Sequence, residues 1–588
     1  MNKEVHDFII SEQTAFETTK IPVTSSYEWN MKDHIERCTN VALGWYHSGK
    51  NDGLRRYDDI VTPIINVAFR SEGFDVKDIV PYVNDIHDSY KSFLVKKRHP
   101  QWARKNELDT FIDEIVESSV IYDLVIVKNV NNVRPEVVPL QKIAFCDQTD
   151  ALGGPICLKH QYSVAELTEF KGKWDDTAID EAIVMSKAEK VVMQANNRVA
   201  KTPGKYIEVF ELHGYLPESW LNENGDPAKY VNQVHIVCYY TSSDGNKNGI
   251  TLFKGKTKGI SNIFKSLVIR KIHGRAMGKS IVESLFEPQV WMNYSAQRIQ
   301  KLLASAINVF QTDSEEYGNQ KLSSLPDNTI LKHEPGKAIT KVDGTPQNLT
   351  AFTNEQVNLQ TQARILGSAS EAQLGVNPTS GTPFALQNLV VQQGQGIHEY
   401  RQGKIATFVA DVLYRDWILQ YLVDDMNKGV TFSEELSLDE MQEIADIIAR
   451  NKAEDQIIKK ILDGELVTEA TREELIANYK EQFTRSGSRK FFEVIKGELE
   501  EIPLEVFVNI KSKQKYMAQD ADKITNVIRE VLRNPQAFQQ VPGVAKAFNQ
   551  LLENSGMSPI DFSQITKTNT SSVAPPQQEV AMSEITTQ

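Results

Sequence analysis

The segment 274–280, Gly-Arg-Ala-Met-Gly-Lys-Ser, carries residue types that can bind a nucleotide phosphate. A P-loop has the pattern GxxxxGK[ST], in which backbone amides hold the phosphates and the lysine contacts them. Here Gly274 is one residue too close to Gly278, and His273 stands where the first glycine belongs. The loop would therefore lack one amide of the cradle. The pattern favours a glycine-rich turn with a solvated Lys279 at a helix start, and a degenerate ATP site is the alternative.

No other group of residues predicts catalysis or metal binding. His398-Glu399 lacks the second histidine of HExxH, and the four cysteines are scattered without a CxxC pair. His160 and His235 stand in apolar, strand-like surroundings, where we expect hydrogen-bonded core histidines rather than catalytic bases. We therefore expect no catalytic residues, no metal site and no cofactor.

Basic side chains are concentrated between Lys254 and Lys279, where neither Asp nor Glu occurs. This reverses the chain's overall balance, since 65 Lys and Arg against 78 Asp and Glu give a net charge of −13. Such a stripe suits nucleic-acid phosphates, and it equally suits an acidic surface on a neighbouring subunit. The candidate residues of this basic stripe are Lys265, Arg270, Lys271, Arg275 and Lys279.

The elements that must position these residues form an α+β pattern. Apolar residues recur at helical spacing over 107–120. The runs 121–127 and 134–140 then read as a hairpin, and Ser163 followed by Glu166 is a capping-box signature for a helix. Three further strands are expected, with hairpin signals that favour antiparallel pairing: Tyr206 to Leu212, Gln233 to Tyr240 and Ile250 to Phe253.

The chain beyond residue 278 is mainly helical in pattern. One helix is expected to start at Ser280, to be interrupted at Pro288, and to continue as a new helix to about Val309. Its apolar positions are spread around the axis, so we expect it to be contacted on more than one side. These positions are Val290, Trp291, Tyr294, Ile299, Leu302, Leu303 and Ile307.

A turn-rich stretch and further helices follow this first long helix. Helix is expected over 350–373 and 384–425, separated by a Gly/Pro/Ser/Thr loop at 375–383. Charged amphipathic helix follows over 435–563, with a short extended piece at 504–510. The last 26 residues lack aromatics and are rich in Ser, Thr, Gln and Pro, a composition typical of a disordered tail.

Composition excludes several classes of protein. Hydrophobic residues make up 40% of the chain and charged residues 24%, which is a folded composition and not that of a disordered protein. The acid surplus argues against tight binding of nucleic acid over the whole surface. No apolar run approaches the ~20 residues of a spanning helix, and the polar N-terminus does not resemble a signal peptide. We expect no membrane span.

The order of segments resembles the portal protein of tailed bacteriophages, the ring through which DNA enters and leaves the capsid. One match is the hairpin followed by RPEVVPLQKIAFCDQTD and then PICLKHQYSVAEL, similar to the portal wing. A second is GRAMGKSIVESLFEPQVWMNYSAQRIQKLLASAIN, similar to the entry into a stem helix. A third is the Gly375-Val-Asn-Pro-Thr-Ser-Gly loop between helices, similar to the channel (tunnel) loop. One departure is Gln148, where related chains often have proline.

The resemblance implies a domain plan. The expected segments are an N-terminal peripheral part (1–60), an α/β wing (61–277), a first stem helix (278–310), a small clip with a short second stem region (311–346), wing helices with the channel loop near 375–384 (347–434), a helical crown (435–562) and a disordered tail (563–588). The resemblance also places the stem interface between subunits at Trp291, Tyr294, Arg298, Leu302 and Leu303, and the DNA-contacting loop at Asn377, Thr379, Ser380, Thr382 and Phe384.

The function implied is structural. The chain would form a cyclic ring, usually of twelve subunits, at one capsid vertex of the virion after assembly in the host cytoplasm. Implied partners are double-stranded DNA bound without sequence preference, the major capsid protein, the terminase motor and tail adaptor proteins. Two alternatives remain open: a packaging or remodelling ATPase that uses 274–280, and a capsid scaffold or adaptor component without a channel.

Overall fold

The computed structural model divides the chain into two compact units, Met1–Val508 and Asn509–Gln588. The second unit lies outside the described residues, as do the expected tail at 563–588 and much of the expected crown. The structure describes residues 2–44, 58–83, 89–130, 134–188, 193–195, 198–200, 206–222, 225–241, 247–305, 309–311, 340–342, 349–369, 373–374, 384–427, 438–464, 468–481 and 504–508.

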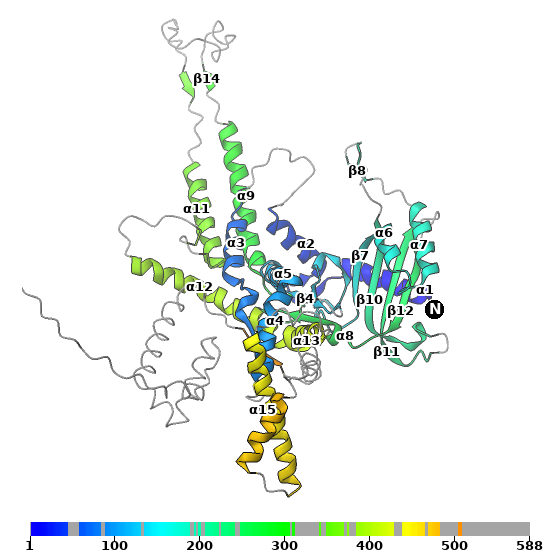
Figure 1. Ribbon diagram of the computed structural model, residues 1–588. Helices are drawn as coiled ribbons and strands as arrows, with labels where there is room; N and C mark the ends of the chain where they lie inside the picture. Colours follow the sequence, from blue (N-terminus) through cyan, green and yellow to red (C-terminus); the bar gives the residue numbers. More distant parts are fainter. Residues whose placement is uncertain are drawn as a thin grey trace, which may run out of the picture. The chain divides into compact units, whose positions relative to one another are not determined.

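A five-stranded antiparallel sheet is the largest β element of the first unit (Figure 1). Its spatial order is β12-β11-β10-β7-β6, and every neighbouring pair is antiparallel. The strands are β6 (Ile143–Phe145), β7 (Ile156–Ser163), β10 (Tyr206–Pro217), β11 (Tyr230–Thr241) and β12 (Lys247–Lys256). The expected α+β class and the three expected strands between 206 and 253 are therefore confirmed.

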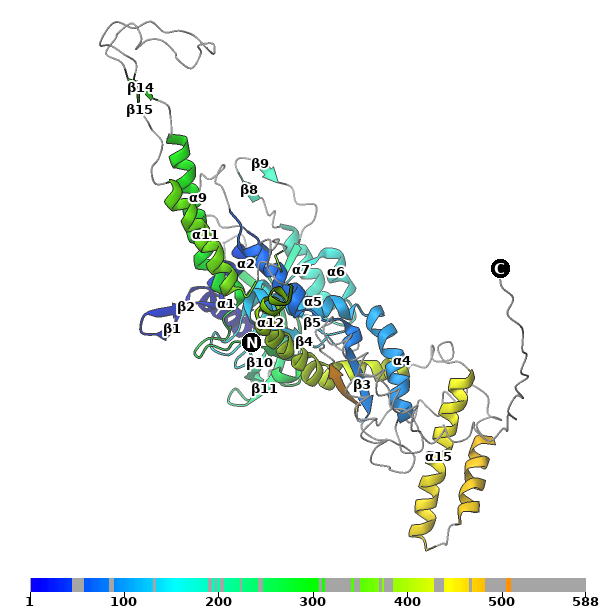
Figure 2. The same cartoon turned by 90° about the vertical axis from the view of Figure 1, so that its left-hand side faces the viewer.

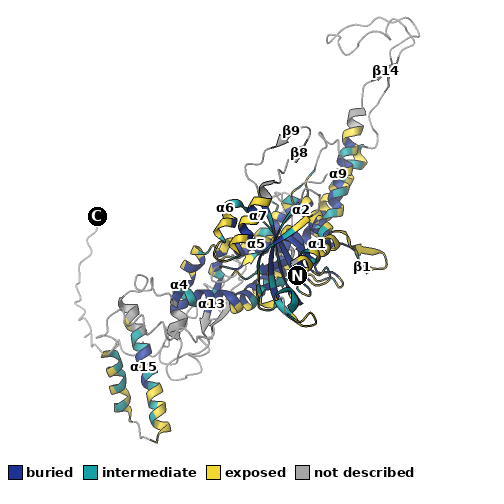
Figure 3. Ribbon diagram, turned by 90° about the vertical axis from the view of Figure 1, so that its right-hand side faces the viewer, coloured by how far each residue is buried: buried dark blue, intermediate teal, exposed yellow. Residues whose placement is uncertain are grey.

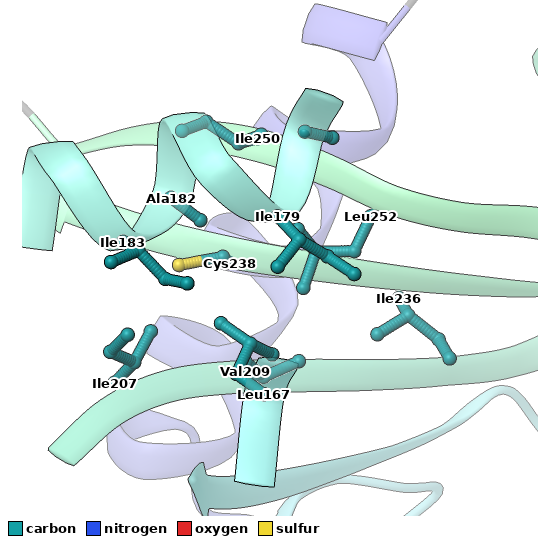
Figure 4. Packing of buried hydrophobic residues seen from close by; sticks show 11 residues of the cluster. Leu167, Ile179, Ala182, Ile183, Ile207, Val209, Ile236, Cys238, Ile250 and Leu252 are labelled. Atoms are coloured by element: carbon teal, nitrogen blue, oxygen red, sulfur yellow. The ribbon is translucent and has the colours of Figure 1, made fainter. Parts of the chain in front are cut away.

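Helices cover both faces of this sheet. Helices α6 (Val164–Glu169) and α7 (Asp176–Ala188) pack on one face, and Ser163 with Glu166 forms the expected capping box at the start of α6. Cys238 of β11 packs in the core beneath them (Figure 4). Because successive strand residues point to opposite faces, Tyr239 lies on the other side, where its hydroxyl donates to the His6 carbonyl of α1 (Asn2–Thr18).

The core beneath α6 and α7 is almost wholly aliphatic. Its buried members are Leu167, Ala178, Ile179, Ala182, Ile183, Ile207, Val209, Ile236, Cys238, Ile250 and Leu252. Each fully buried Leu, Ile or Val side chain contributes roughly 1.5–3 kcal/mol relative to its exposed state.

The helix α5 (Leu108–Tyr122) carries the expected apolar stripe. Its members are all buried, namely Leu108, Phe111, Ile112, Ile115, Val116 and Val120. The strand expected at 121–127 begins later than the pattern indicated, because α5 continues to Tyr122 and ends on Asp123 with φ 51°. Aspartate is among the few residues that tolerate this left-handed conformation. Strand β4 (Val125–Lys128) then pairs with β5 (Glu136–Val137), which confirms the hairpin, and with β13 (Phe264–Leu267).

Helix α9 (Ile281–Ser305) is continuous through Pro288, so the expected break there is wrong. Proline in a helix interior costs about 3 kcal/mol, and the burial of Val282, Leu285 and Met292 on either side of it opposes that cost. The helix also ends before Val309, which instead begins strand β14 (Val309–Gln311). Strand β14 pairs antiparallel with β15 (Thr340–Val342), which precedes α11 (Leu349–Leu366).

The helices α9 and α11 lie side by side in both views, with the two short strands at the same end (Figure 2). The chain thus forms a helix–strand–strand–helix unit over its described residues. Gly367 ends α11 against α3 (Val61–Glu72), because a Cβ at Gly367 would lie 2.1 Å from Cγ2 of Ile64.

The expected long helix over 384–425 is present with a change of winding. It consists of α12 (Phe384–Thr407), a π-helix η5 (Phe408–Ile418) and α13 (Leu419–Asn427). Within η5 the hydroxyl of the buried Tyr414 lies 2.9 Å from Nε2 of His99. The expected extended piece at 504–510 is strand β16 (Leu504–Val508), which pairs with β3 (Ile79–Val83).

The remaining described elements lie in the same unit. They are β1 (Ile21–Thr24), β2 (Tyr27–Trp29), α2 (Met31–Ala42), η1 (Val76–Asp78), α4 (Ser89–Lys105), η2 (Leu140–Lys142), β8 (Met193–Ala195), β9 (Arg198–Ala200), η3 (Glu218–Trp220), α8 (Ile260–Ile263) and α15 (Leu438–Leu462).

Two glycine substitutions should have opposite effects on stability. In Gly278→Ala, the new Cβ would lie 1.8 Å from Oδ2 of Asp123 and 2.6 Å from the Arg270 carbonyl oxygen, so we expect a loss of about 2–3 kcal/mol. In Gly396→Ala on α12, nothing lies within 4 Å of the new Cβ. Because alanine has a better helix propensity than glycine, Gly396→Ala should stabilise the fold by about 0.5–1 kcal/mol.

Chemical unfolding of the two variants and the wild type measures both effects. An unchanged unfolding midpoint in Gly278→Ala would contradict the close approach of this loop to Asp123.

Candidate assembly surface and channel segments

The start of α9 is fixed by a cap and a buried ion pair. The Oγ atom of Ser280 accepts the Glu283 amide at 2.9 Å, which closes the first turn. The Glu283 carboxylate receives both terminal nitrogens of Arg275, at 3.1 Å to Oε1 and 2.6 Å to Oε2. His34 of α2 adds a contact at 3.5 Å to Oε2. The first turn of α9 is therefore tied to α2 and to the segment that precedes the helix.

Arg275 is itself fully enclosed, with 1% of its side chain exposed. It donates to the carbonyl oxygens of Met277 and Gly278, and to the hydroxyl of Tyr27. Burial alone would raise the pKa of Glu283, but the hydrogen bonds from His34 and Arg275 outweigh it and lower that pKa to about 2. The pair therefore stays ionised over the physiological range.

Three backbone amides of segment 274–280 donate hydrogen bonds within the chain. The amide of Ala276 donates to the Gln148 carbonyl at 2.8 Å. The amides of Gly278 and Lys279 donate to the carbonyls of Asp123 and Arg270, at 3.4 and 3.1 Å. In a P-loop such amides point at phosphate oxygens. The segment is instead a turn that wraps around the end of α5.

The basic stripe is not a single surface, and its interpretation is corrected at two positions. Arg275 is buried with Glu283, and Lys265 pairs with Asp416 of η5 at 2.7 Å. Arg270 and Lys271 are exposed and Lys279 is half-buried. Spacing in the sequence does not distinguish a buried arginine from a surface one, because the partner Glu283 lies on the next helix.

One face of α9 exposes two large aromatic side chains and an arginine. Trp291 is 55% exposed and Tyr294 is 50% exposed, and their rings meet edge to face at 5.8 Å. Arg298 donates to the Tyr294 hydroxyl at 2.8 Å and lies over the ring of Phe352 on α11, 5.8 Å from its centroid. We call Trp291, Tyr294 and Arg298 the α9 aromatic face. Its side chains are held in place by one another.

The other sides of α9 contact the chain's own helices α2, α3, α5 and α11. Met292, Ala296 and Ile299 are buried there. The polar side chain of Gln289 is also buried and accepts the Ile60 amide at 3.1 Å. Exposed and buried residues therefore alternate along α9 (Figure 3). The expectation of contacts on several sides is confirmed, and these contacts are intramolecular.

Several expected site residues fall outside what the structure describes. Leu302 and Leu303 belong to α9, but their side chains are outside the described set, as is that of Phe384 at the start of α12. The rest of the expected channel loop also lies outside it, namely Asn377, Thr379, Ser380 and Thr382.

No protein-family model matches the chain, and no curated protein matches its sequence at a significant level. Among the described side chains, no group of three or more His, Cys, Asp and Glu is placed to bind a metal ion. No described helix has the length and apolarity needed to cross a membrane.

His160 and His235, which we expected to be hydrogen-bonded rather than catalytic, both have hydrogen-bond partners. His235 is buried against the amide oxygen of Gln233 at 2.8 Å, and burial lowers the pKa of His235 to about 4. His160 contacts Oε2 of Glu211 at 2.8 Å. The second oxygen of Glu211 contacts His213, and Lys128 contacts both oxygens. These partners are up to 83 residues apart, so no local motif indicates the cluster.

Acid should weaken the anchor of α9. Because the Glu283 carboxyl has a lowered pKa, the stability it contributes is complete above about pH 4.5 and is lost as the pH falls toward 2. The shift corresponds to about 3 kcal/mol. In Arg275→Met we expect a loss of about 3 kcal/mol at neutral pH, because Glu283 keeps its charge without its main partner.

A matched control is Lys171→Met, which breaks an exposed ion pair with Asp180 and should cost less than about 1 kcal/mol. Denaturant unfolding between pH 2.5 and 7 measures both variants. Equal losses in the two would refute the assigned role of Arg275.

Proposed function

We propose that the chain is the portal subunit of a tailed bacteriophage, a structural ring protein that conducts DNA at one capsid vertex. The observation that carries the proposal is the helix–strand–strand–helix unit of α9, β14, β15 and α11, attached to an antiparallel α+β body. This order agrees with a stem, a clip and a wing. The resemblance in segment order, described above, points to the same family.

The α9 aromatic face supports assembly into a ring. Trp, Tyr and Arg are the residues that most often dominate the binding energy of protein interfaces. Trp291 and Tyr294 are exposed and in contact, and Arg298 lies over the Tyr294 ring. This arrangement suits contact with a second subunit. A contact between two different surfaces of the same chain is heterologous, and such contacts close into rings when the rotation permits.

The charge of the chain supports a passive channel. A wall that bound many phosphates would release counterions and hold DNA in place, whereas this chain has a net charge of −13. In this proposal the ring only guides the DNA. The terminase motor supplies the energy, the major capsid protein surrounds the wing, and tail adaptors bind the clip end.

Charge placed on the α9 aromatic face should prevent ring assembly. We expect Trp291→Asp with Tyr294→Asp to give free subunits, because each interface would bury unpaired carboxylates at several kcal/mol per subunit. The control is Val184→Asp on α7, which is 63% exposed and lies on another element. Sedimentation velocity and negative-stain imaging distinguish rings from free subunits. Intact rings in the double variant would show that this face is not the subunit interface.

The nucleotide alternative has its own test. In the portal proposal Lys279→Ala changes neither ring assembly nor nucleotide turnover, because the amides of Ala276, Gly278 and Lys279 already have partners within the chain. Phosphate release from ATP is measured for the purified wild type and the variant. Hydrolysis by the wild type that disappears in Lys279→Ala would replace the portal proposal with an ATPase.

A further inference from the structure

Four charged or ionisable side chains form a buried cluster where α12 meets α3 and the end of α5. Arg401 donates from Nε to Oε1 of Glu72 at 2.8 Å and from Nη1 to Oδ1 of Asp123 at 3.0 Å. Nδ1 of His398 lies 3.0 Å from the same Oε1 of Glu72. Glu72 and His398 are 0% exposed, Asp123 is 1% and Arg401 is 5%. We call these four residues the α12 cluster.

Two atoms of the α12 cluster have no hydrogen-bond partner among the described groups. They are Oε2 of Glu72 and Nε2 of His398, and both are buried. Buried polar atoms in proteins are nearly always hydrogen-bonded. The polar groups of the cluster are therefore not fully satisfied by hydrogen bonds from the described residues.

The charges of the α12 cluster do not balance without an added proton. Two carboxylates face one guanidinium, and a neutral imidazole that donates from Nδ1 leaves a net charge of −1 in the interior. An unpaired buried charge is expensive. One further proton, on the imidazole or on a carboxylate, brings the net charge to zero.

We propose that the α12 cluster takes up one proton as the pH falls and acts as a proton-dependent latch that fixes α12 to α3 and α5. The proton belongs to the cluster as a whole, since strongly interacting groups titrate together. When the proton leaves, the interior acquires a net negative charge and α12 separates more readily. The latch does not depend on the proposed portal function.

Among the described residues, the groups around the α12 cluster do not supply the missing positive charge, because Arg70 of α3 and Asp411 and Arg415 of η5 are exposed. From segment 268–280 only the backbone amide of Arg270 reaches Asp123, at 2.8 Å, while the side chain of Arg270 is in an exposed residue. On α12, Glu399 and Lys404 are exposed, and Lys404 lies over the Tyr400 ring. From α5 the remaining contact is the Ser119 carbonyl, which accepts from Arg401 at 2.9 Å.

The direction of the pH effect follows from this environment. Burial raises the pKa of Asp123 to about 6, even though Arg401 and the Arg270 amide act to lower it. A group whose pKa is raised by folding favours the folded state at low pH. The latch is therefore complete below about pH 4, weakens as the pH rises toward 6, and changes little above that.

Hydrogen–deuterium exchange of residues 396–407 tests the latch. In the wild type, protection corrected for intrinsic exchange should fall by up to about tenfold per pH unit between pH 4 and 6, the limit for release of one proton, and should stay level above pH 6. In Glu72→Gln the cluster is neutral without an added proton, so protection should stay level over this range. The matched control Glu399→Gln lies one residue from His398 on the same helix and is exposed, so it should keep the wild-type profile.

Other outcomes also decide the matter. A level profile in the wild type, or a wild-type profile in Glu72→Gln, overturns the latch. If circular dichroism shows that Glu72→Gln does not fold, Asp123→Asn replaces it. Asparagine tolerates the left-handed backbone of this position but cannot take up the proton, so protection should stay level between pH 4 and 6. A wild-type profile in Asp123→Asn also overturns the proposal. Ring imaging is not affected by any of these results.

Discussion

The structure depends on the way Asp123 is held at the end of α5. Its left-handed backbone conformation ends the helix, and its side chain joins segments that are far apart in the sequence. Oδ2 accepts the Arg270 amide and Oδ1 accepts Arg401 of α12. The backbone carbonyl of Asp123 accepts the Gly278 amide, two residues before the cap of α9. The positions of α5, α9 and α12 are therefore all tied to one residue, and Gly278 has to lack a side chain for this to be possible.

Local signals in the sequence predicted the elements whose causes are local. The Ser163–Glu166 capping box, the apolar stripe over 107–120 and the turn-flanked strands all depend on residues a few positions apart. The errors have long-range causes. Pro288 remains inside α9 because the helix is packed against α2, α3, α5 and α11, and no window around the proline contains those partners. Arg275 is buried because the chain returns to bring Glu283 and Tyr27 to it.

In the candidate site too, features with local causes could be predicted from the sequence and features with long-range causes could not. The resemblance placed Trp291, Tyr294 and Arg298 at a subunit interface on one helix, but it could not say which face of that helix the chain's own helices would cover. The Arg298–Phe352 contact joins α9 to α11 across a segment of more than 40 residues, much of which lies outside the described part. The α12 cluster was missed for this reason as well. His398 was compared with a metalloprotease motif because Glu399 is its neighbour, whereas the carboxylate it contacts is Glu72.

The anchor of α9 and its aromatic face have to be considered together. A side chain contributes most to binding when it is already ordered before the partner arrives, because less conformational entropy is lost on association. The Arg275–Glu283 pair fixes the first turn of α9, and the mutual contacts of Trp291, Tyr294 and Arg298 restrict their rotamers. Helix α3 contacts both α9 and α12, and it ends in Glu72 of the latch. Helix α3 is therefore the element through which the described residues connect the α12 cluster to the α9 aromatic face. Coupling between the α12 cluster and the α9 aromatic face needs an element that can adopt two arrangements. The structural change that carries it would be a movement of α3 against α9, and the aromatic face itself would keep its conformation.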